Sequence, residues 1–119
     1  MKVVNLDKLN KDIDKFVRER DWDQFHSVKN LCMALSVETS ELLEIFQWMS
    51  EKESNLIVEN QRAMDKVQDE ISDIFIYLMR ILSKTNIDLE SAVRLKMKKN
   101  EEKYPIQLSK GNSKKYDEF

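Results

Sequence analysis

Two acidic pairs with matching spacing are the residues of this chain best suited to chemistry. Glu38 and Glu41 form a Glu-x-x-Glu pair, and Glu70 and Asp73 form a Glu-x-x-Asp pair further along. Residues three apart on a helix point within about 60° of each other, so each pair presents two carboxylates to one side. Ionised carboxylates taken out of water need partners. The pattern therefore predicts a cation bound between the two pairs.

Both pairs lie in segments whose hydrophobic residues follow the same helical face. The first pair shares its sector with Leu31, Ala34, Leu35, Leu42 and Ile45, and the second with Val67, Ile74, Tyr77 and Ile81. Consecutive helices with a short link pack antiparallel. The four carboxylates are therefore expected to meet at one helix interface. The alternative is that they are ordinary solvated side chains on a mixed face.

The expected ligands are all oxygen atoms, which suit a hard cation. Three or four carboxylates with room for water favour Mg²⁺, with Mn²⁺ possible, and the open positions of such an ion bind phosphate oxygens. A di-iron centre in a helical bundle needs Glu-x-x-His pairs, and no histidine follows either acidic pair. Glu44 is expected to be auxiliary: a fifth ligand, a residue that supports the ligands, or a surface acid.

The composition predicts helices nearly throughout, because the chain has one glycine and one proline. Helices are expected at residues 6–20, 28–49, 61–83 and 89–103, with caps at Asn5, Ser27 and Asp88, a loop at 21–26 and a break at 50–55. The third helix is hydrophobic around most of its circumference, so it is expected to be surrounded by protein on nearly every side. Pro105 is expected to end the fourth helix.

Length and charge exclude several classes of protein. A chain of 119 residues fits a single domain over residues 1–119, with a polar tail at 106–119, and such a small body is expected to form a homo-oligomer. A formal net charge of −2 argues against binding polymeric nucleic acid. Cys32 is the single cysteine and is expected to be an apolar filler. The absence of a leader and of a long apolar run predicts a cytoplasmic protein with no membrane partner.

The surroundings of the acidic pairs form a recognisable pattern. Residues 42–69 separate the pairs, and the neighbouring motifs are Phe25-His26, Asn30, Glu44-x-Phe46-Gln47-Trp48, Ile76-Tyr77-Leu78, Lys96-Met97, Asn100, Tyr104-Pro105 and Gly111-x-Ser113-x-Lys115-Tyr116. From about Trp22 to Tyr116, the chain resembles the all-α nucleoside triphosphate pyrophosphohydrolases, in particular the MazG-like and dCTP pyrophosphatase branch. The resemblance implies an all-α, four-helix MazG-like bundle completed by homo-oligomerisation, as a dimer or tetramer.

The resemblance also implies a reaction: Mg²⁺-dependent cleavage between the α and β phosphates of a nucleotide, which releases monophosphate and pyrophosphate. It carries over the four acids, Glu38, Glu41, Glu70 and Asp73, as metal ligands. Glu41, with Glu38, is the candidate catalytic residue that orients the attacking water. The sequence leaves open which acid has that role.

The remaining site residues are expected to bind the nucleotide itself. The base and sugar candidates are His26, Asn30, Trp22, Trp48 and Tyr77, although Trp48 and Tyr77 fit a packing role equally well. The phosphate candidates are Lys96, Asn100 and Lys103, which continue one stripe from Leu89 and Val93, with Lys114 and Lys115 as weaker candidates. A lysine-rich helix end that is simply solvated is the alternative.

The dCTP-like surroundings favour a pyrimidine deoxynucleotide such as dCTP, and a role in cleansing the nucleotide pool. The chain departs from the dCTP pyrophosphatases at Ser27 and Val28 and over residues 51–65, which affects the choice of base more than the reaction. Two other functions stay open. One is a non-catalytic oligomeric helical adaptor or regulator, in which the acids form interhelical salt bridges with lysines. The other is a metal store or sensor that ignores nucleotides.

Overall fold

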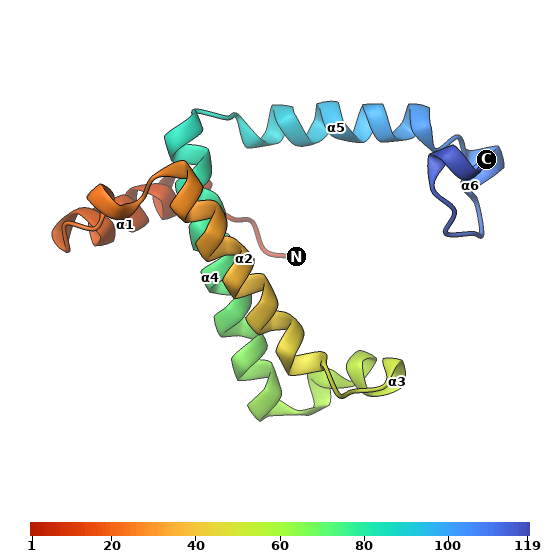
Figure 1. The fold of residues 1–119 in the computed structure, drawn as a ribbon, viewed down its shortest axis with the longest axis horizontal. Coiled ribbons are helices and arrows are strands. Elements are labelled where there is room, and N and C mark those ends of the chain that lie inside the picture. Colours follow the sequence, from red (N-terminus) through yellow and green to blue (C-terminus); the bar gives the residue numbers. More distant parts are fainter. The chain divides into compact units, whose positions relative to one another are not determined.

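The computed structural model describes all 119 residues, and every regular element in it is helical (Figure 1). The α-helices are α1 (Leu6–Glu19), α2 (Val28–Phe46), α3 (Glu51–Asn55), α4 (Gln61–Thr85), α5 (Leu89–Lys103) and α6 (Ile106–Ser109), and 3₁₀ turns lie at Asp23–Phe25, Ile57–Glu59 and Tyr116–Glu118. The predicted all-α class is confirmed. Contacts divide the chain into two compact units, residues 1–86 and residues 87–119, which are described separately.

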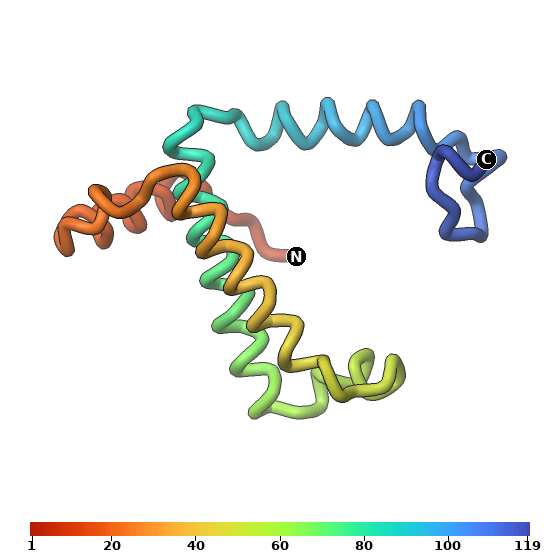
Figure 2. Tube along the Cα trace, in the orientation of Figure 1, coloured from red at the N-terminus to blue at the C-terminus, as the bar shows by residue number.

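An antiparallel pair of helices forms the centre of the first unit. Figure 2 shows α2 and α4 running side by side along most of their lengths, and this is the most extensive contact between elements in the chain. Helix α1 also packs against α4. The antiparallel packing predicted from the short link is therefore present, and it brings the inner faces of α2 and α4 together.

Side-chain caps fix the starts of the helices. Asn5, Ser27 and Asp88 each accept a hydrogen bond from the backbone N–H three residues on, at 3.0, 3.1 and 2.9 Å. These are the caps that the sequence predicts, because a side-chain oxygen at that position satisfies a free N–H of the first turn. Asn60 caps α4 in the same way at 3.1 Å. Helix α5 ends at Lys103, before Pro105, as expected.

The break expected at residues 50–55 does separate α2 from α4, but most of this segment forms the short helix α3 and is not a loop. Ser50 Oγ accepts a hydrogen bond from the Glu53 backbone N–H at 3.1 Å, which starts the helix. A Ser-x-x-Glu sequence is a helix-start signal, and here it starts a helix although no hydrophobic period follows it. The preceding helix, α2, ends at Phe46, three residues before the expected end at Met49.

The hydrophobic core of the first unit is small. The buried apolar side chains are Val17, Leu31, Val67 and Met79. The expectation that the third helix is surrounded on nearly every side is not met within the single chain. Its neighbours there include α1, α2 and the 3₁₀ turn at Ile57–Glu59, and Ile71 remains 52% exposed and Ile76 38% exposed. On α2, Cys32 is exposed and so is not a buried filler, since it lies about 100° around the helix from buried Leu31.

The second unit contains α5 and a folded tail. The Tyr104 ring meets the rings of Tyr116 and Phe119 edge-on, with centroids 6.2 and 6.0 Å apart. The polar tail expected at residues 106–119 therefore contains α6 and a 3₁₀ turn and folds back onto the end of α5. Gly111 has a φ of 81°, a conformation that glycine adopts without strain. No helix in the chain combines the length and apolar character needed to cross a lipid bilayer.

Candidate metal and nucleotide site

Three carboxylates meet where α2 and α4 pack together. Glu38 and Glu41 reach the interface from α2, and Glu70 reaches it from α4. One carboxylate oxygen from each residue lies within 4.8 Å of the other two. Glu38 and Glu70 are half-buried, whereas Glu41 is exposed. Glu38, Glu41 and Glu70 thus form a carboxylate socket that is open to solvent at Glu41.

The neighbouring carboxylates act on Glu38. The hydrogen bond that a protonated Glu38 shares with Glu70, together with burial and the neighbouring Glu41, raises the pKa of Glu38 to about 7. The charge of Asp73 adds to this effect. When the acids are ionised, Glu38 Oε2 and Glu70 Oε2 are buried with no hydrogen-bond partner. Without a cation, the ionised cluster therefore concentrates negative charge in one place, and protonation of Glu38 relieves part of it.

A hard divalent cation fits these residues. The ion pairs of the chain involve none of the four acids, so no lysine or arginine occupies the socket. Buried carboxylate oxygens without donors are costly unless they are protonated or bind a cation. The donor set contains only oxygen, as Mg²⁺ and Mn²⁺ prefer.

Asp73 and Tyr77 lie beside this cluster on α4. Asp73 is exposed and is not one of the three clustered carboxylates, although its charge acts on both Glu38 and Tyr77. Tyr77 is half-buried, and its pKa is raised by burial first and then by the charges of Glu38, Asp73 and Glu41. The charges of these acids therefore reach the phenol of Tyr77.

An open pocket of about 510 Å³ lies next to the carboxylates, and its lining is Glu41, Glu44, Ile45, Lys66, Asp69 and Glu70. Glu44, expected to be auxiliary, lines this pocket. Lys66 was not predicted as a site residue, although it precedes Glu70 by four residues and so lies one helical turn away on the same side of α4. A neighbouring pocket of about 350 Å³ shares Lys66 and adds Arg62. The acidic site is therefore bordered by two cations at the start of α4.

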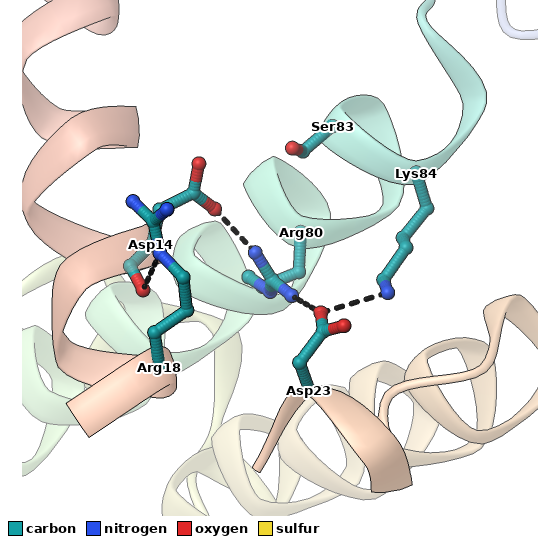
Figure 3. A pocket seen from close by; sticks show the side chains of 6 residues that line it. All are labelled: Asp14, Arg18, Asp23, Arg80, Ser83 and Lys84. Atoms are coloured by element: carbon teal, nitrogen blue, oxygen red, sulfur yellow. Dashed lines mark hydrogen bonds and ion pairs between the residues drawn. The ribbon is translucent and has the colours of Figure 1, made fainter. Parts of the chain in front are cut away.

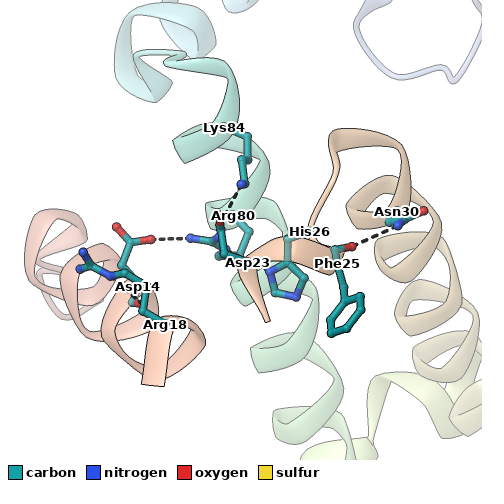
Figure 4. A network of polar contacts seen from close by, with 8 residues as sticks. All are labelled: Asp14, Arg18, Asp23, Phe25, His26, Asn30, Arg80 and Lys84. Carbon is teal, nitrogen blue, oxygen red and sulfur yellow. Dashed lines mark hydrogen bonds and ion pairs between the residues drawn. The ribbon is translucent and has the colours of Figure 1, made fainter. Parts of the chain in front are cut away.

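The base candidates His26 and Asn30 are held by contacts within the first unit. His26 is half-buried, and its Nδ1 accepts a hydrogen bond from Arg80 Nε at 3.3 Å. The side-chain amide of Asn30 donates to the Phe25 carbonyl oxygen at 3.0 Å (Figure 4). Both side chains are thereby fixed around the 3₁₀ turn that precedes α2.

The two tryptophans differ in their surroundings. The Trp22 ring packs edge-on against Phe16, with centroids 5.7 Å apart, and remains 44% exposed. Trp48 follows the end of α2 and is 89% exposed. A packing role for Trp48 therefore finds no support within a single chain, whereas Trp22 has a packing partner.

The phosphate candidates belong to the second unit. Lys96, Asn100 and Lys103 are all exposed on α5. The ammonium nitrogen of Lys103 lies 4.8 Å from the centroid of the Tyr116 ring, which is a cation–π contact. The structure does not bring the three together with the acids within one unit.

A buried arginine is the main residue that the sequence analysis missed. Arg80 is 4% exposed, and its guanidinium pairs with Asp14 and with Asp23, the latter at 2.7 Å (Figure 3). Lys84 also contacts Asp23, at 2.8 Å, and the hydrogen bonds and charges of these cations lower the pKa of Asp23. A pocket of about 230 Å³ lies beside this network. A charged residue inside the hydrophobic run of α4 was the available signal, because a buried arginine requires an acidic partner.

One face of α4 carries most of these groups. In order along the helix they are Arg62, Lys66, Glu70, Asp73, Tyr77, Arg80 and Lys84, each three or four residues from the next. Such spacing keeps side chains on one side of a helix, and the rise from Asp73 to Arg80 is about 10 Å. Cations therefore come first along this face, acids next, and Tyr77 and the Arg80–His26 contact after them.

Comparisons with known proteins point to one family. The model of the MazG-like family matches residues 33–119. Among characterised proteins, the chain is 41% identical over 105 residues to dCTP pyrophosphatase 1 of Bos taurus and 40% identical to that of Homo sapiens, and each match covers 88% of this chain and 62% of the relative. The chain therefore spans about three fifths of the length of these relatives.

A solved structure shows the same fold. A pyrophosphatase from Archaeoglobus fulgidus superposes with a TM-score of 0.79 at 38% sequence identity, and the match covers 88% of this chain and 96% of that one. The family match includes all of α4 and residues 33–46 of α2. The resemblance inferred from the acidic pairs is confirmed, and the chain belongs to the MazG-like family.

Proposed function

We propose that this chain is a metal-dependent nucleoside triphosphate pyrophosphohydrolase, which cleaves a nucleotide between the α and β phosphates to give a monophosphate and pyrophosphate. The observation that carries the proposal is the cluster of Glu38, Glu41 and Glu70, whose buried oxygens have no partner in the chain. Family membership and the dCTP pyrophosphatase relatives support the reaction class.

The cation is Mg²⁺, with Mn²⁺ as a substitute. Glu38, Glu41 and Glu70 hold it, and Asp73 lies one turn beyond Glu70 to complete the set. When bound, the ion neutralises phosphate charge and polarises the phosphorus that is attacked. Glu41 is the exposed member of the cluster, so it is the residue placed to orient a water for in-line attack. No protein nucleophile is required.

The substrate is a deoxynucleoside triphosphate of the dCTP type. His26, Asn30, Tyr77, Trp22 and Trp48 bind its base and sugar, and Lys96, Asn100 and Lys103 bind its phosphates. The order of groups on α4 supports this orientation, because Tyr77 and the Arg80–His26 contact follow the acids along one helix face.

The active form is a homo-oligomer in the cytoplasm, a dimer or a tetramer. Large hydrophobic side chains remain exposed on the two central helices of the single chain, namely Met33, Val37 and Leu43 on α2 and Ile71 and Ile76 on α4. Burying such surfaces against a second copy is how a small domain completes its core. The net charge of −2 argues against binding of polymeric nucleic acid.

The two alternatives receive less support. An adaptor held together by the acids would pair them with lysines or arginines, yet none of the four acids forms an ion pair in the chain. A metal store or sensor would bind the cation but ignore nucleotides. Thermal shift with Mg²⁺ alone, and then with Mg²⁺ and a non-hydrolysable dCTP analogue, separates these functions.

The decisive experiment measures pyrophosphate release from dCTP and from a panel of other nucleoside triphosphates, with and without Mg²⁺. Glu38→Gln and Glu70→Gln are expected to abolish release while the helical circular dichroism is retained. Glu59→Gln, an exposed glutamate outside the site, serves as the matched control and should keep full activity. Undiminished activity in both site variants would overturn the proposal.

A further inference from the structure

The side chains of Arg80 and His26 make a specific contact whose chemistry can be taken further. Arg80 Nε donates to His26 Nδ1 at 3.3 Å, while its two terminal nitrogens bind the carboxylates of Asp14 and Asp23 (Figure 4). Arg80 is 4% exposed, and it joins α1, the 3₁₀ turn and α4. The guanidinium is thus fixed on three sides, and the orientation of the histidine ring depends on it.

This contact determines which ring nitrogen carries the proton. An arginine side chain is always protonated and can only donate hydrogen bonds. Nδ1 of His26 must therefore offer its lone pair, so the proton of the neutral ring is on Nε2. Nε2 makes no hydrogen bond within the chain, which leaves one N–H donor available to a ligand.

We propose that Arg80 is a positioning residue that holds His26 as the Nε2–H tautomer, so that His26 donates one hydrogen bond to an acceptor on the nucleotide. The proposal rests on the proposed function for the identity of that ligand. The acceptor is a carbonyl oxygen or an unprotonated ring nitrogen of the base, since an exocyclic amino group would oppose a donor with a donor. Arg80 thereby contributes to the choice of base without touching it.

The charges around the ring favour the neutral form. Burial comes first and the charge of Arg80 second in lowering the pKa of His26; Lys84 adds to the lowering, and the carboxylate of Asp23 opposes it. Asp14 faces the same guanidinium from α1 and neutralises part of its charge. The ring therefore remains uncharged near neutral pH. A charged ring would carry a proton on both nitrogens and would lose the hydrogen bond from Arg80.

The position of the contact on α4 agrees with this role. Arg80 follows Tyr77 by three residues, so the two side chains lie on one face, and the charges of Glu38, Asp73 and Glu41 act on Tyr77. His26 is thus placed beyond Tyr77, on the side away from Lys66. A nucleotide with its phosphates at the acids and its base beyond Tyr77 would have its base on the His26 side of the site.

Nitrogen-15 NMR of the histidine ring tests the tautomer directly. His26 is the only histidine in the chain, so its two ring nitrogens give unambiguous signals. In the wild-type protein, we expect Nδ1 to resonate as an unprotonated nitrogen and Nε2 as a protonated one. A wild-type spectrum showing a protonated Nδ1 at neutral pH would overturn the proposal, whether or not any variant folds.

Two variants then separate positioning from simple stability. In Arg80→Met, the two nitrogen shifts should move toward each other and the pKa of His26 should rise, because the donor and its charge are gone. Lys84→Met is the matched control: it removes a neighbouring cation that contacts Asp23 and not the ring, so the wild-type tautomer should remain. Folded Arg80→Met protein with an unchanged tautomer pattern would contradict the proposal.

Kinetics with dCTP complete the test. Loss of one positioned hydrogen bond is expected to raise the KM of Arg80→Met about tenfold with a much smaller change in kcat, whereas Lys84→Met should keep the wild-type KM. An unchanged KM in Arg80→Met would count against the role in base binding. If the wild-type protein shows the Nε2–H tautomer but hydrolyses no nucleotide, the proposed function fails while the Arg80–His26 assignment stands.

Discussion

Glu38 and Glu70 face each other across the α2–α4 interface, and each buries one carboxylate oxygen that has no hydrogen-bond donor. Two ionised carboxylates in this arrangement repel each other and have lost part of their hydration. The chain tolerates them because one can hold a proton, as the raised pKa of Glu38 shows. The site is therefore less stable when it is fully ionised, and this gives a cation a defined energetic role.

Metal binding at Glu38 and Glu70 should stabilise the folded protein. Mg²⁺ is expected to raise the melting temperature of the wild-type protein, because it binds the folded state and the socket is absent from the unfolded chain. Glu38→Gln should melt at a higher temperature than the wild type without metal, since it removes the repulsion, and should lose most of the Mg²⁺ response. Differential scanning fluorimetry across a Mg²⁺ series measures both effects. Glu59→Gln is the control, and an equal Mg²⁺ shift in Glu38→Gln would contradict the assignment.

The stability of the metal-free protein should depend on pH through Glu38. Its pKa rises from 4.5 to about 7 on folding, so between these values the folded state binds more protons than the unfolded state at this residue. The free energy of unfolding contributed by Glu38 is therefore fully present below about pH 4.5 and is lost as the pH rises through 7. Urea denaturation from pH 4.5 to 8, compared between wild type and Glu38→Gln, isolates this slope.

The comparison with Glu38→Gln is needed because protonation of His26 changes the free energy of unfolding with pH in the opposite direction. Its pKa is lowered on folding from 6.5, so its contribution to stability is lost as the pH falls through the window below 6.5. That contribution is present in both proteins and cancels in the difference. Saturating Mg²⁺ should flatten the slope of the wild type. A wild-type curve parallel to that of the variant in the absence of metal would show that Glu38 is not coupled to Glu70.

The sequence could predict those features that depend on local periodicity. The phase of Glu38 and Glu70 relative to their hydrophobic neighbours follows from 3.6 residues per turn, and a short link makes the two helices antiparallel. The caps at Ser27 and Asp88 are equally local, because one side chain serves an N–H three residues on. These parts of the fold needed no knowledge of distant contacts.

Other features required tertiary information. The partners of Arg80 lie 54 to 66 residues earlier in the chain, and nothing in the spacing of α4 identifies Asp14 or His26 as those partners. The cover over Ile71 is not local either: the hydrophobic circumference of α4 predicts burial, and the single chain leaves this side chain 52% exposed. Patterns along one helix show which faces need covering, and they do not show what covers them.

Lys66 should contribute to binding the phosphates. It lines the open pocket together with Glu41 and Glu70, and it supplies a positive charge beside the carboxylates. Lys66→Met is expected to raise the KM for a nucleoside triphosphate about tenfold or more, the loss typical of one hydrogen bond to a charged group. Steady-state kinetics with dCTP measures this. Lys52→Met, on the exposed helix α3, is the matched control, and an unchanged KM in Lys66→Met would exclude the lysine from the substrate site.

Charge placed on the uncovered faces of α2 and α4 should break the oligomer. Leu43 is 68% exposed and Ile71 is 52% exposed in the single chain, although both are large and apolar. In an assembled homo-oligomer such side chains are buried, so a lysine at either position would be desolvated without a partner. Leu43→Lys and Ile71→Lys are expected to shift the protein to monomer in light scattering coupled to size-exclusion chromatography. Val58→Lys, which is 69% exposed and lies outside these helices, should leave the assembly unchanged. A wild-type protein that elutes as a monomer at high concentration would show that these hydrophobic faces are not covered by a second copy.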